Sequence, residues 1–217
     1  MLQSQIGNRK SKMWRGKLLR MPHGEMTTSR LEAFSDGVIA IIVTIMVLEL
    51  RAPDHPTLPG LLHVLPVFVS YGLSFLVVAI MWVNHHHMIH VVRHVTARLL
   101  WSNLNLLFWM SLVPFVTEFL GKNYRQPLAV AFYGLDLTLC ALAFYFLRME
   151  LIHQESHDLE MVEYHRAIQR KNTISLLLYF LSAPLAYVSV YVSYFIFALI
   201  PALYFLPEKK LAAPQNN

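Results

Sequence analysis

The chain has 217 residues, of which 56% are hydrophobic and only 14% are charged, and its mean hydropathy is +0.45. Soluble domains carry about a quarter charged residues, so this composition excludes an ordinary soluble protein and indicates a polytopic membrane protein of one domain. The net charge of +5 would also suit nucleic acid. Because the basic residues lie between the apolar segments, we expect membrane lipid as the partner and no nucleic acid.

A basic segment, residues 1–29, precedes the first apolar stretch. We expect a cytoplasmic tail near lipid headgroups, because such a segment has too little apolar surface to fold alone. We expect no secretory signal peptide, since the first apolar run begins only at Phe34 and no small-residue cleavage site follows it. Cys140 is the only cysteine, which excludes an intrachain disulfide.

Apolar segments of membrane-spanning length dominate the rest of the chain. A spanning helix needs about 20 residues, with about 17 as a practical minimum. We therefore expect an all-α fold with six transmembrane helices per subunit, over residues 34–50, 61–83, 99–120, 128–147, 173–187 and 189–206. The last two belong to one stretch that contains Pro184 and Pro201, so one long bent helix stays an alternative. The expected layout is the tail 1–29, a transmembrane domain 30–207 and a cytoplasmic tail 208–217.

The lysines and arginines indicate the orientation. With both termini inside, the inner segments hold 15 of the 18 Lys and Arg residues. Positive residues are enriched in cytoplasmic loops, so we expect both termini in the cytoplasm. A five-span layout would move Lys209 and Lys210 outside. Loop 148–171 is expected to be a helical extension on the cytoplasmic side.

The first span has an apolar face. At 100° per residue, Phe34, Ile45 and Leu48 fall within about 60° of Ile41. Thr44 lies at the edge of this face. A stripe of this kind faces lipid, neighbouring helices or a shared axis, and periodicity alone leaves the three possibilities open.

The opposite side of the same span is polar. Asp36 lies about 140° from Ile41. An ionised side chain in a membrane helix costs free energy, so it needs partners. The second and third spans offer Trp82, His85, His86 and Asn103. We expect a buried network that fixes helix packing, with direct ion contact by Asp36 as the alternative.

A resemblance begins in the first span. The motif R-x-x-x-F-S-D, formed by Arg30, Phe34, Ser35 and Asp36, with the run that follows it to Leu50, resembles the first span of the lysosomal potassium channel family and its bacterial relatives. The second and third spans carry further matches: Ser74, Phe75, Trp82, His85, His86, Asn103, Pro114, Phe115 and Thr117. The resemblance covers about residues 30–207.

The resemblance implies a six-span subunit in a homotetramer, whose first spans line a central pore narrowed by apolar side chains. It implies a modestly selective potassium channel in a bacterial inner membrane, with potassium as permeant ion and no other cofactor. Ile41 would form the constriction, with Thr44 and Ile45 beside it and Leu48 one turn further. The motif residues Arg30, Phe34, Ser35 and Asp36 would tie the first span to Trp82, His85, His86 and Asn103.

A row of histidines admits another interpretation. His86, His90 and His94 are spaced i, i+4 and i+8, as metal ligands on one helix face would be. Membrane di-iron enzymes need several separated histidine clusters together with carboxylates. We therefore expect packing or interfacial histidines, no metal and no enzymatic activity. A proton-sensing role stays open, because imidazole titrates near neutral pH.

Asp136 supports the alternative function. It lies midway along the fourth span, and a carboxylate at that depth is by default a functional candidate. The alternative is a proton- or cation-coupled secondary transporter that uses Asp136, although we see no inverted repeat of the transporter kind. A plain hydrogen bond to a neighbouring tyrosine or serine would also account for this residue. Glu49, near the outer end of the first span, would attract cations to a pore mouth.

Overall fold

The computed structural model describes residues 27–92, 94–154 and 159–205. Within these ranges every regular element is a helix, as the apolar segments predicted. Most of the expected leading tail, and all of the expected tail 208–217, lie outside the described residues. In chain order the helices are α2 (Thr28–Leu48), α3 (Leu58–His90), α4 (Ala97–Met110), α5 (Val113–Lys122), α6 (Pro127–Gln154), α7 (Leu159–Leu185) and α8 (Val190–Phe205).

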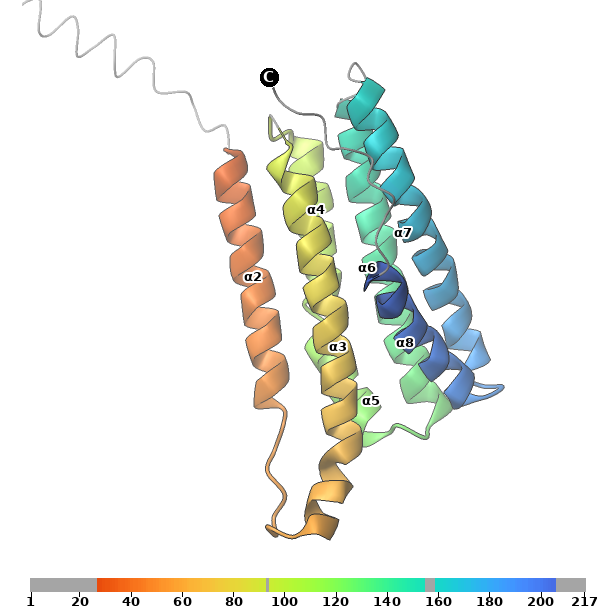
Figure 1. Cartoon of the computed structure of the whole chain (residues 1–217). Helices are drawn as coiled ribbons and strands as arrows, with labels where there is room; N and C mark the ends of the chain where they lie inside the picture. Colours follow the sequence, from red (N-terminus) through yellow and green to blue (C-terminus); the bar gives the residue numbers. More distant parts are fainter. Residues whose placement is uncertain (1–26, 93, 155–158, 206–217) are drawn as a thin grey trace, which may run out of the picture.

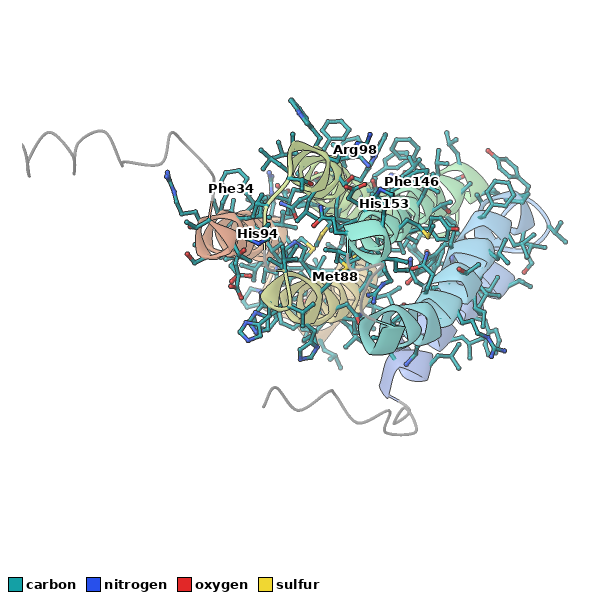
Figure 2. The ribbon with its side chains drawn as sticks, turned by 90° about the horizontal axis from the view of Figure 1, so that it is seen from above. Phe34, Met88, His94, Arg98, Phe146 and His153 are labelled. Atoms are coloured by element: carbon teal, nitrogen blue, oxygen red, sulfur yellow. The ribbon has the colours of Figure 1, made fainter. Side chains whose placement is uncertain are left out.

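The helices lie side by side and form an elongated bundle (Figure 1). In the view from above, α2 and the α7–α8 pair stand at opposite sides, with α3, α4 and α6 between them (Figure 2). α6 packs against α4, α5, α7 and α8, so it is the central helix of the subunit. α2 packs against α3, α4 and α5.

Threonine caps fix where two helices begin. Thr57 accepts a hydrogen bond from the amide of Gly60 at 3.2 Å, and Thr96 accepts one from the amide of Leu99 at 3.2 Å. Each bond satisfies one of the amides that a helix leaves unpaired in its first turn.

The expected third span, 99–120, is a helix with a break. α4 ends at Met110 and α5 begins at Val113. Pro114 has no amide hydrogen to donate to the preceding turn, which interrupts the helix there. Ser111, at the break, donates its hydroxyl to the carbonyl oxygen of Phe108 at 2.7 Å. The two pieces together still form one apolar stretch of 26 residues, Ala97–Lys122.

In the part of the chain that the structure describes, four helical stretches are long and apolar enough to cross a membrane: α2, α3, α4 continued by α5, and α6. The last apolar stretch is two helices joined by a turn over 186–189, so the alternative of one long bent helix is wrong. α8 is apolar but spans only 16 residues, below the usual spanning length of about 20. α7 has a polar first half, and only its second half is apolar.

Small residues allow close packing at two crossings. A methyl group on Gly121 of α5 would lie 2.8 Å from the Cα atom of Val67 in α3, so the two backbones approach too closely for any side chain. Gly134 of α6 similarly faces Ser182 and Phe197. Membrane helices are held together largely by packing rather than by a hydrophobic driving force, so these glycines set the distances between α5 and α3 and between α6 and the α7–α8 pair.

Candidate functional site

The two faces of α2 have different surroundings. The exposed face is apolar: Ile41 is 58% exposed and Leu48 is 76% exposed, with Phe34, Thr44 and Ile45 also exposed. The residues buried against the rest of the subunit are Leu31, Ser35, Ile39, Ile42 and Met46. Because α2 stands at the edge of the bundle (Figure 1), its apolar stripe points away from the other helices of the same subunit.

A chain of hydrogen bonds joins the buried face of α2 to α4 and α3. Ser35 Oγ donates to the carbonyl oxygen of Leu31 at 2.9 Å and accepts from Asn103 Nδ2 at 2.9 Å. Asn103 Oδ1 lies 2.7 Å from Nε2 of His85. Since the amide oxygen of Asn103 can only accept, His85 must donate from Nε2. Ser35, Asn103 and His85 are all fully buried. Their hydrogen bonds therefore fix the rotation of α2 against its neighbours.

Two further contacts join α2 to α3 at the half-buried edge of the interface. The indole Nε1 of Trp82 donates to Asp36 Oδ1 at 2.9 Å. Nδ1 of His86 lies 3.0 Å from Oε1 of Glu32. Glu32 and Asp36 are four residues apart and therefore share one helix face. The pairing of Glu32 with His86 was not anticipated from the sequence.

Two residues of the R-x-x-x-F-S-D motif lie elsewhere. Arg30 and Phe34 are exposed and take no part in the hydrogen bonds just described. The reason is helical geometry, since Arg30 precedes Ile41 by about three turns and so falls on the apolar side of α2. Figure 2 places Phe34 at the outer edge of the bundle. In this subunit the motif is therefore divided between the two faces of α2.

A second polar cluster lies between α3, α5 and α6. Ser74 and the hydroxyl of Tyr133 are 2.9 Å apart, and Thr117 Oγ1 donates to Ser74 Oγ at 2.7 Å. Thr117 Oγ1 also lies 2.6 Å from the carbonyl oxygen of Val113, and its single hydroxyl hydrogen serves one of these two acceptors at a time. The sequence interpretation noted Ser74 and Thr117 but missed Tyr133. A tyrosine within a buried apolar helix is itself a signal, because its hydroxyl must find a partner.

Asp136 is buried in α6, with 5% of its surface exposed. Its Oδ2 atom has no hydrogen-bond partner among the described residues. The tyrosine one turn before it, Tyr133, is directed to Ser74 instead. The expected hydrogen bond from a neighbouring tyrosine or serine is therefore not made to Oδ2, and Asp136 stays a candidate for protonation chemistry.

The histidine row is broken by the end of α3. The rings of His86 and His90 stack, with centroids 5.9 Å apart and planes at 21°. α3 ends at His90, so His94 lies beyond the helix and does not continue the face. The expectation that His86, His90 and His94 share one helix face is thus wrong for His94. Among the described residues, the side chains grouped closely enough to hold a metal ion are instead Glu32, Asp36 and His86.

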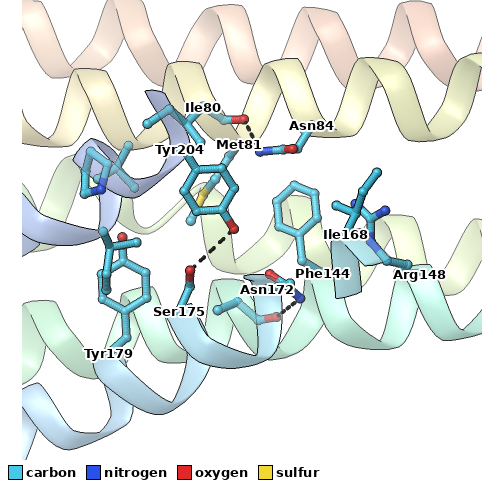
Figure 3. A pocket seen from close by; sticks show the side chains of 14 residues that line it. Ile80, Met81, Asn84, Phe144, Arg148, Ile168, Asn172, Ser175, Tyr179 and Tyr204 are labelled. Carbon is cyan, nitrogen blue, oxygen red and sulfur yellow. Dashed lines mark hydrogen bonds between the residues drawn. The ribbon is translucent and has the colours of Figure 1, made fainter. Parts of the chain in front are cut away.

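A pocket lies within the other half of the subunit. It offers about 40 Å³ to a water-sized molecule between α3, α6, α7 and α8, and it is partly open to the outside. Its polar lining comes from Asn84, Arg148, Asn172, Ser175 and Tyr204 (Figure 3). Tyr204 and Ser175 approach each other at 3.4 Å across it. No residue of α2 lines this pocket, so it is separate from the apolar stripe.

Comparisons with known proteins match this arrangement to one family. The family model described as "Endosomal/lysosomal potassium channel TMEM175" matches residues 30–114, which include α2, α3, α4 and the beginning of α5. A potassium channel of Chryseobacterium sp. (strain P1-3) is 39% identical over 186 residues, which is 86% of this chain and 96% of that protein.

Two further relatives extend the comparison. A potassium channel of Streptomyces collinus is 39% identical over 125 residues, covering 54% of this chain and 61% of that protein. The crystal structure of a lysosomal potassium-selective channel TMEM175 homolog from Chamaesiphon minutus superposes with a TM-score of 0.74 at 27% sequence identity. That superposition covers 82% of this chain and 95% of the other.

Proposed function

The chain belongs to the TMEM175 family, and from this premise we propose that it is a potassium-permeable, modestly selective cation channel and not an enzyme. Relatives named potassium channels, one of them matched over almost its whole length, support the proposal. The observation that carries it further is the bare apolar stripe of α2. We propose that this stripe lines a central pore, with Ile41 at the constriction.

The pore would lie between subunits. The interior of one subunit is occupied by packed side chains, whereas α2 leaves one whole face uncovered at the edge of the bundle. Several copies with these faces turned to one axis would bring rings of Ile41, Ile45 and Leu48 together. The family resemblance favours four copies, so we propose a homotetramer.

An apolar ring of this kind acts as a gate because water either fills the ring or leaves it. A narrow ring of isoleucines offers no ligand to a cation, so water leaves the gap and ions stop. When the ring widens, a hydrated or partly hydrated ion passes. Thr44 supports a weak potassium preference: its Oγ1 donates to the carbonyl oxygen of Ile41 at 2.8 Å, which leaves the lone pairs of the oxygen for a passing ion.

The hydrogen bonds on the other face support this placement of the stripe. Ser35 and Asp36 attach α2 to Asn103 and Trp82. Rotating α2 to bury Ile41 would break both attachments. We therefore propose that these residues position the pore helix rather than contact the ion.

Potassium flux from liposomes tests the constriction. We expect Ile41→Asn and Ile41→Ala to raise the leak, because a polar or smaller ring no longer excludes water. Ile174→Asn is the matched control: Ile174 is 50% exposed on α7, away from α2, and its substitution should leave flux unchanged. Unchanged flux in both Ile41 variants would place the constriction elsewhere.

The oligomeric state is tested by native mass spectrometry of the purified protein. We expect four copies per particle, and a particle with one copy would end the proposal of a shared pore. Asp36→Ala should lower the yield of tetramer, because α2 loses its bond to Trp82. A stable tetramer with altered ion preference would instead assign Asp36 to ion contact.

We also propose six membrane crossings with both termini in the cytoplasm of a bacterial plasma membrane. Four helices meet the spanning length, and α7 with α8 would supply two shorter crossings as an antiparallel pair. Labelling of cysteines introduced at Ser29 and Ser189 would test this. The layout places Ser29 inside, and Ser189, in the turn after α7, outside.

Asp136 keeps a secondary transporter as a second candidate, because it is buried and its Oδ2 has no hydrogen-bond partner among the described residues. A transporter would show saturating flux coupled to a pH gradient and lost in Asp136→Asn. The channel proposal expects unitary currents in planar bilayers, retained in Asp136→Asn. Recording both variants in opposed potassium and proton gradients separates the two functions.

A further inference from the structure

Three side chains meet on the side of α2 that faces away from the apolar stripe. Glu32 and Asp36 come from consecutive turns of α2, and His86 comes from α3. One ligand atom from each lies within 4.8 Å of the others. Two of these atoms, Nδ1 of His86 and Oε1 of Glu32, are already 3.0 Å apart. We propose that these three residues form a binding site for a divalent transition-metal ion, with Zn²⁺ as the best match.

The donor set suits such an ion. Zinc binds imidazole nitrogen and carboxylate oxygen at about 2.0–2.2 Å, and three protein ligands with a water in the fourth position are a common arrangement. Tetrahedral geometry at these bond lengths places ligand atoms about 3.3 Å apart. The separations of up to 4.8 Å here therefore close with small side-chain rotations. Magnesium and calcium prefer oxygen ligands throughout, so the imidazole of His86 selects against them.

The surroundings of these three residues also suit a metal ion. The side chains of His86 and Glu32 are 43% and 23% exposed, and Nδ1 of His86 is itself covered, so an ion would reach it after a rotation of the side chain and without unfolding of the subunit. Asp36 Oδ1 is held by the indole of Trp82 at 2.9 Å, so Oδ2 is the oxygen that would bind the ion. Hydrogen bonds of this kind orient metal-binding carboxylates and raise affinity.

Occupancy would have a mechanical consequence, which rests on the proposed pore. Glu32 and Asp36 belong to the helix that carries Ile41, and His86 belongs to α3. A bound ion would therefore clamp α2 to α3 through metal bonds. Widening of the Ile41 ring requires α2 to move relative to its neighbours, so the bound ion should hold the pore closed.

Metal binding is measured by isothermal titration calorimetry of the full-length protein in detergent, after chelator treatment, with ZnCl₂ and with MgCl₂. We expect about one Zn²⁺ per subunit and no heat from Mg²⁺. Glu32→Gln and His86→Ala should each weaken zinc affinity at least about tenfold, in the range seen when metal-site residues are replaced. Size-exclusion elution and helical circular dichroism of each variant show that the protein is still folded.

His90→Ala is the matched control. His90 stacks on His86 one turn later on the same helix but does not belong to the three-residue cluster. We expect its affinity for Zn²⁺ to stay within about twofold of the wild type. A site formed by the histidine row would instead lose zinc in His90→Ala and keep it in Glu32→Gln, which would overturn the proposal. Equal zinc binding by wild type and both cluster variants would overturn it as well.

The clamp is tested separately, with Zn²⁺ on both sides of potassium-loaded liposomes. Zinc should lower flux through the wild type and through His90→Ala, but leave flux through Glu32→Gln unchanged. Calorimetric binding with unaltered wild-type flux would overturn the clamp and leave the metal site standing. A wild-type protein that binds zinc but never conducts potassium would refute the channel proposal and not the site.

Discussion

α2 and α6 are both long and apolar enough to cross a membrane, yet they meet different surroundings. In the spanning part of α2 28% of the residues are buried, against 61% in α6. α6 packs on four other helices and holds the subunit together. α2 is attached by one face and leaves the other bare. The difference indicates that α6 stabilises the fold of one subunit, and it is consistent with the proposal that α2 faces the other subunits.

The largest effect on stability is expected on the α6 side. Phe197 of α8 is fully buried and packs edge-on against Tyr133 of α6, with centroids 5.0 Å apart. Phe197→Ala should lower the free energy of unfolding by about 3 kcal/mol, the low end for such truncations, because helices in lipid lack the hydrophobic transfer contribution. Unfolding by SDS titration, followed by circular dichroism, measures it.

Phe195 provides the control for that experiment, since it lies two residues earlier in α8 and is exposed. Phe195→Ala should change the free energy of unfolding by no more than about 0.5 kcal/mol. Equal losses in the two variants would mean that α8 is not packed as described.

A smaller effect is expected where α2 is attached. Asn103→Ala removes the side chain that links Ser35 to His85 by hydrogen bonds. It leaves a buried imidazole N–H of His85 unpaired. We expect a loss of about 2 kcal/mol in the free energy of unfolding. Asn105→Ala, an exposed asparagine on the same helix, should be nearly neutral. If Asn105→Ala proved the more harmful, the assigned rotation of α4 would be wrong.

Removing one hydroxyl within the α6 interface should cost less. Tyr133→Phe loses the contact with Ser74 but keeps the ring. Hydrogen bonds between membrane helices contribute about 0.6 kcal/mol on average and about 1.7 at most, so we expect a loss of about 1 kcal/mol in the same SDS titration. Tyr145→Phe on the same helix is the comparison, and a loss as large as that of Tyr133→Phe would argue against the Ser74 contact.

The smallest stability effect is expected on the bare face of α2. Ile41→Ala should change the free energy of unfolding of the subunit by less than about 0.5 kcal/mol, while it raises potassium leak. Its neighbour Ile42 is buried, and Ile42→Ala should cost about 2 kcal/mol. Finding the order reversed would remove the distinction between the two faces.

The sequence could predict the features that depend on local periodicity. The two faces of α2 follow from 100° per residue, and Ser35, Asp36, Trp82, His85 and Asn103 are recognisable as polar residues in apolar helices. All five indeed take part in hydrogen bonds between helices.

Features that depend on how helices meet could not be predicted in the same way. The pairing of Glu32 with His86, and of Tyr133 with Ser74, is set by the axial rotation and register of separate helices. Local hydropathy also gave no boundary for α7, because its polar first half is continuous with its apolar second half in one helix. The exposure of Arg30 within one subunit follows from helical geometry, and the packing role that the motif implied for it stays a prediction.

The unequal lengths of α2 and α3 have a consequence for the lipid around them. At 1.5 Å per residue, the 21 residues of α2 extend about 32 Å and the 33 residues of α3 about 50 Å, across a hydrocarbon layer of about 30 Å. α3 can absorb a change in bilayer thickness by tilting, and the bond from Trp82 to Asp36 makes α2 follow. Acyl-chain length should therefore change the tilt of α2, and if α2 lines the pore as proposed, bilayer thickness should also change conduction.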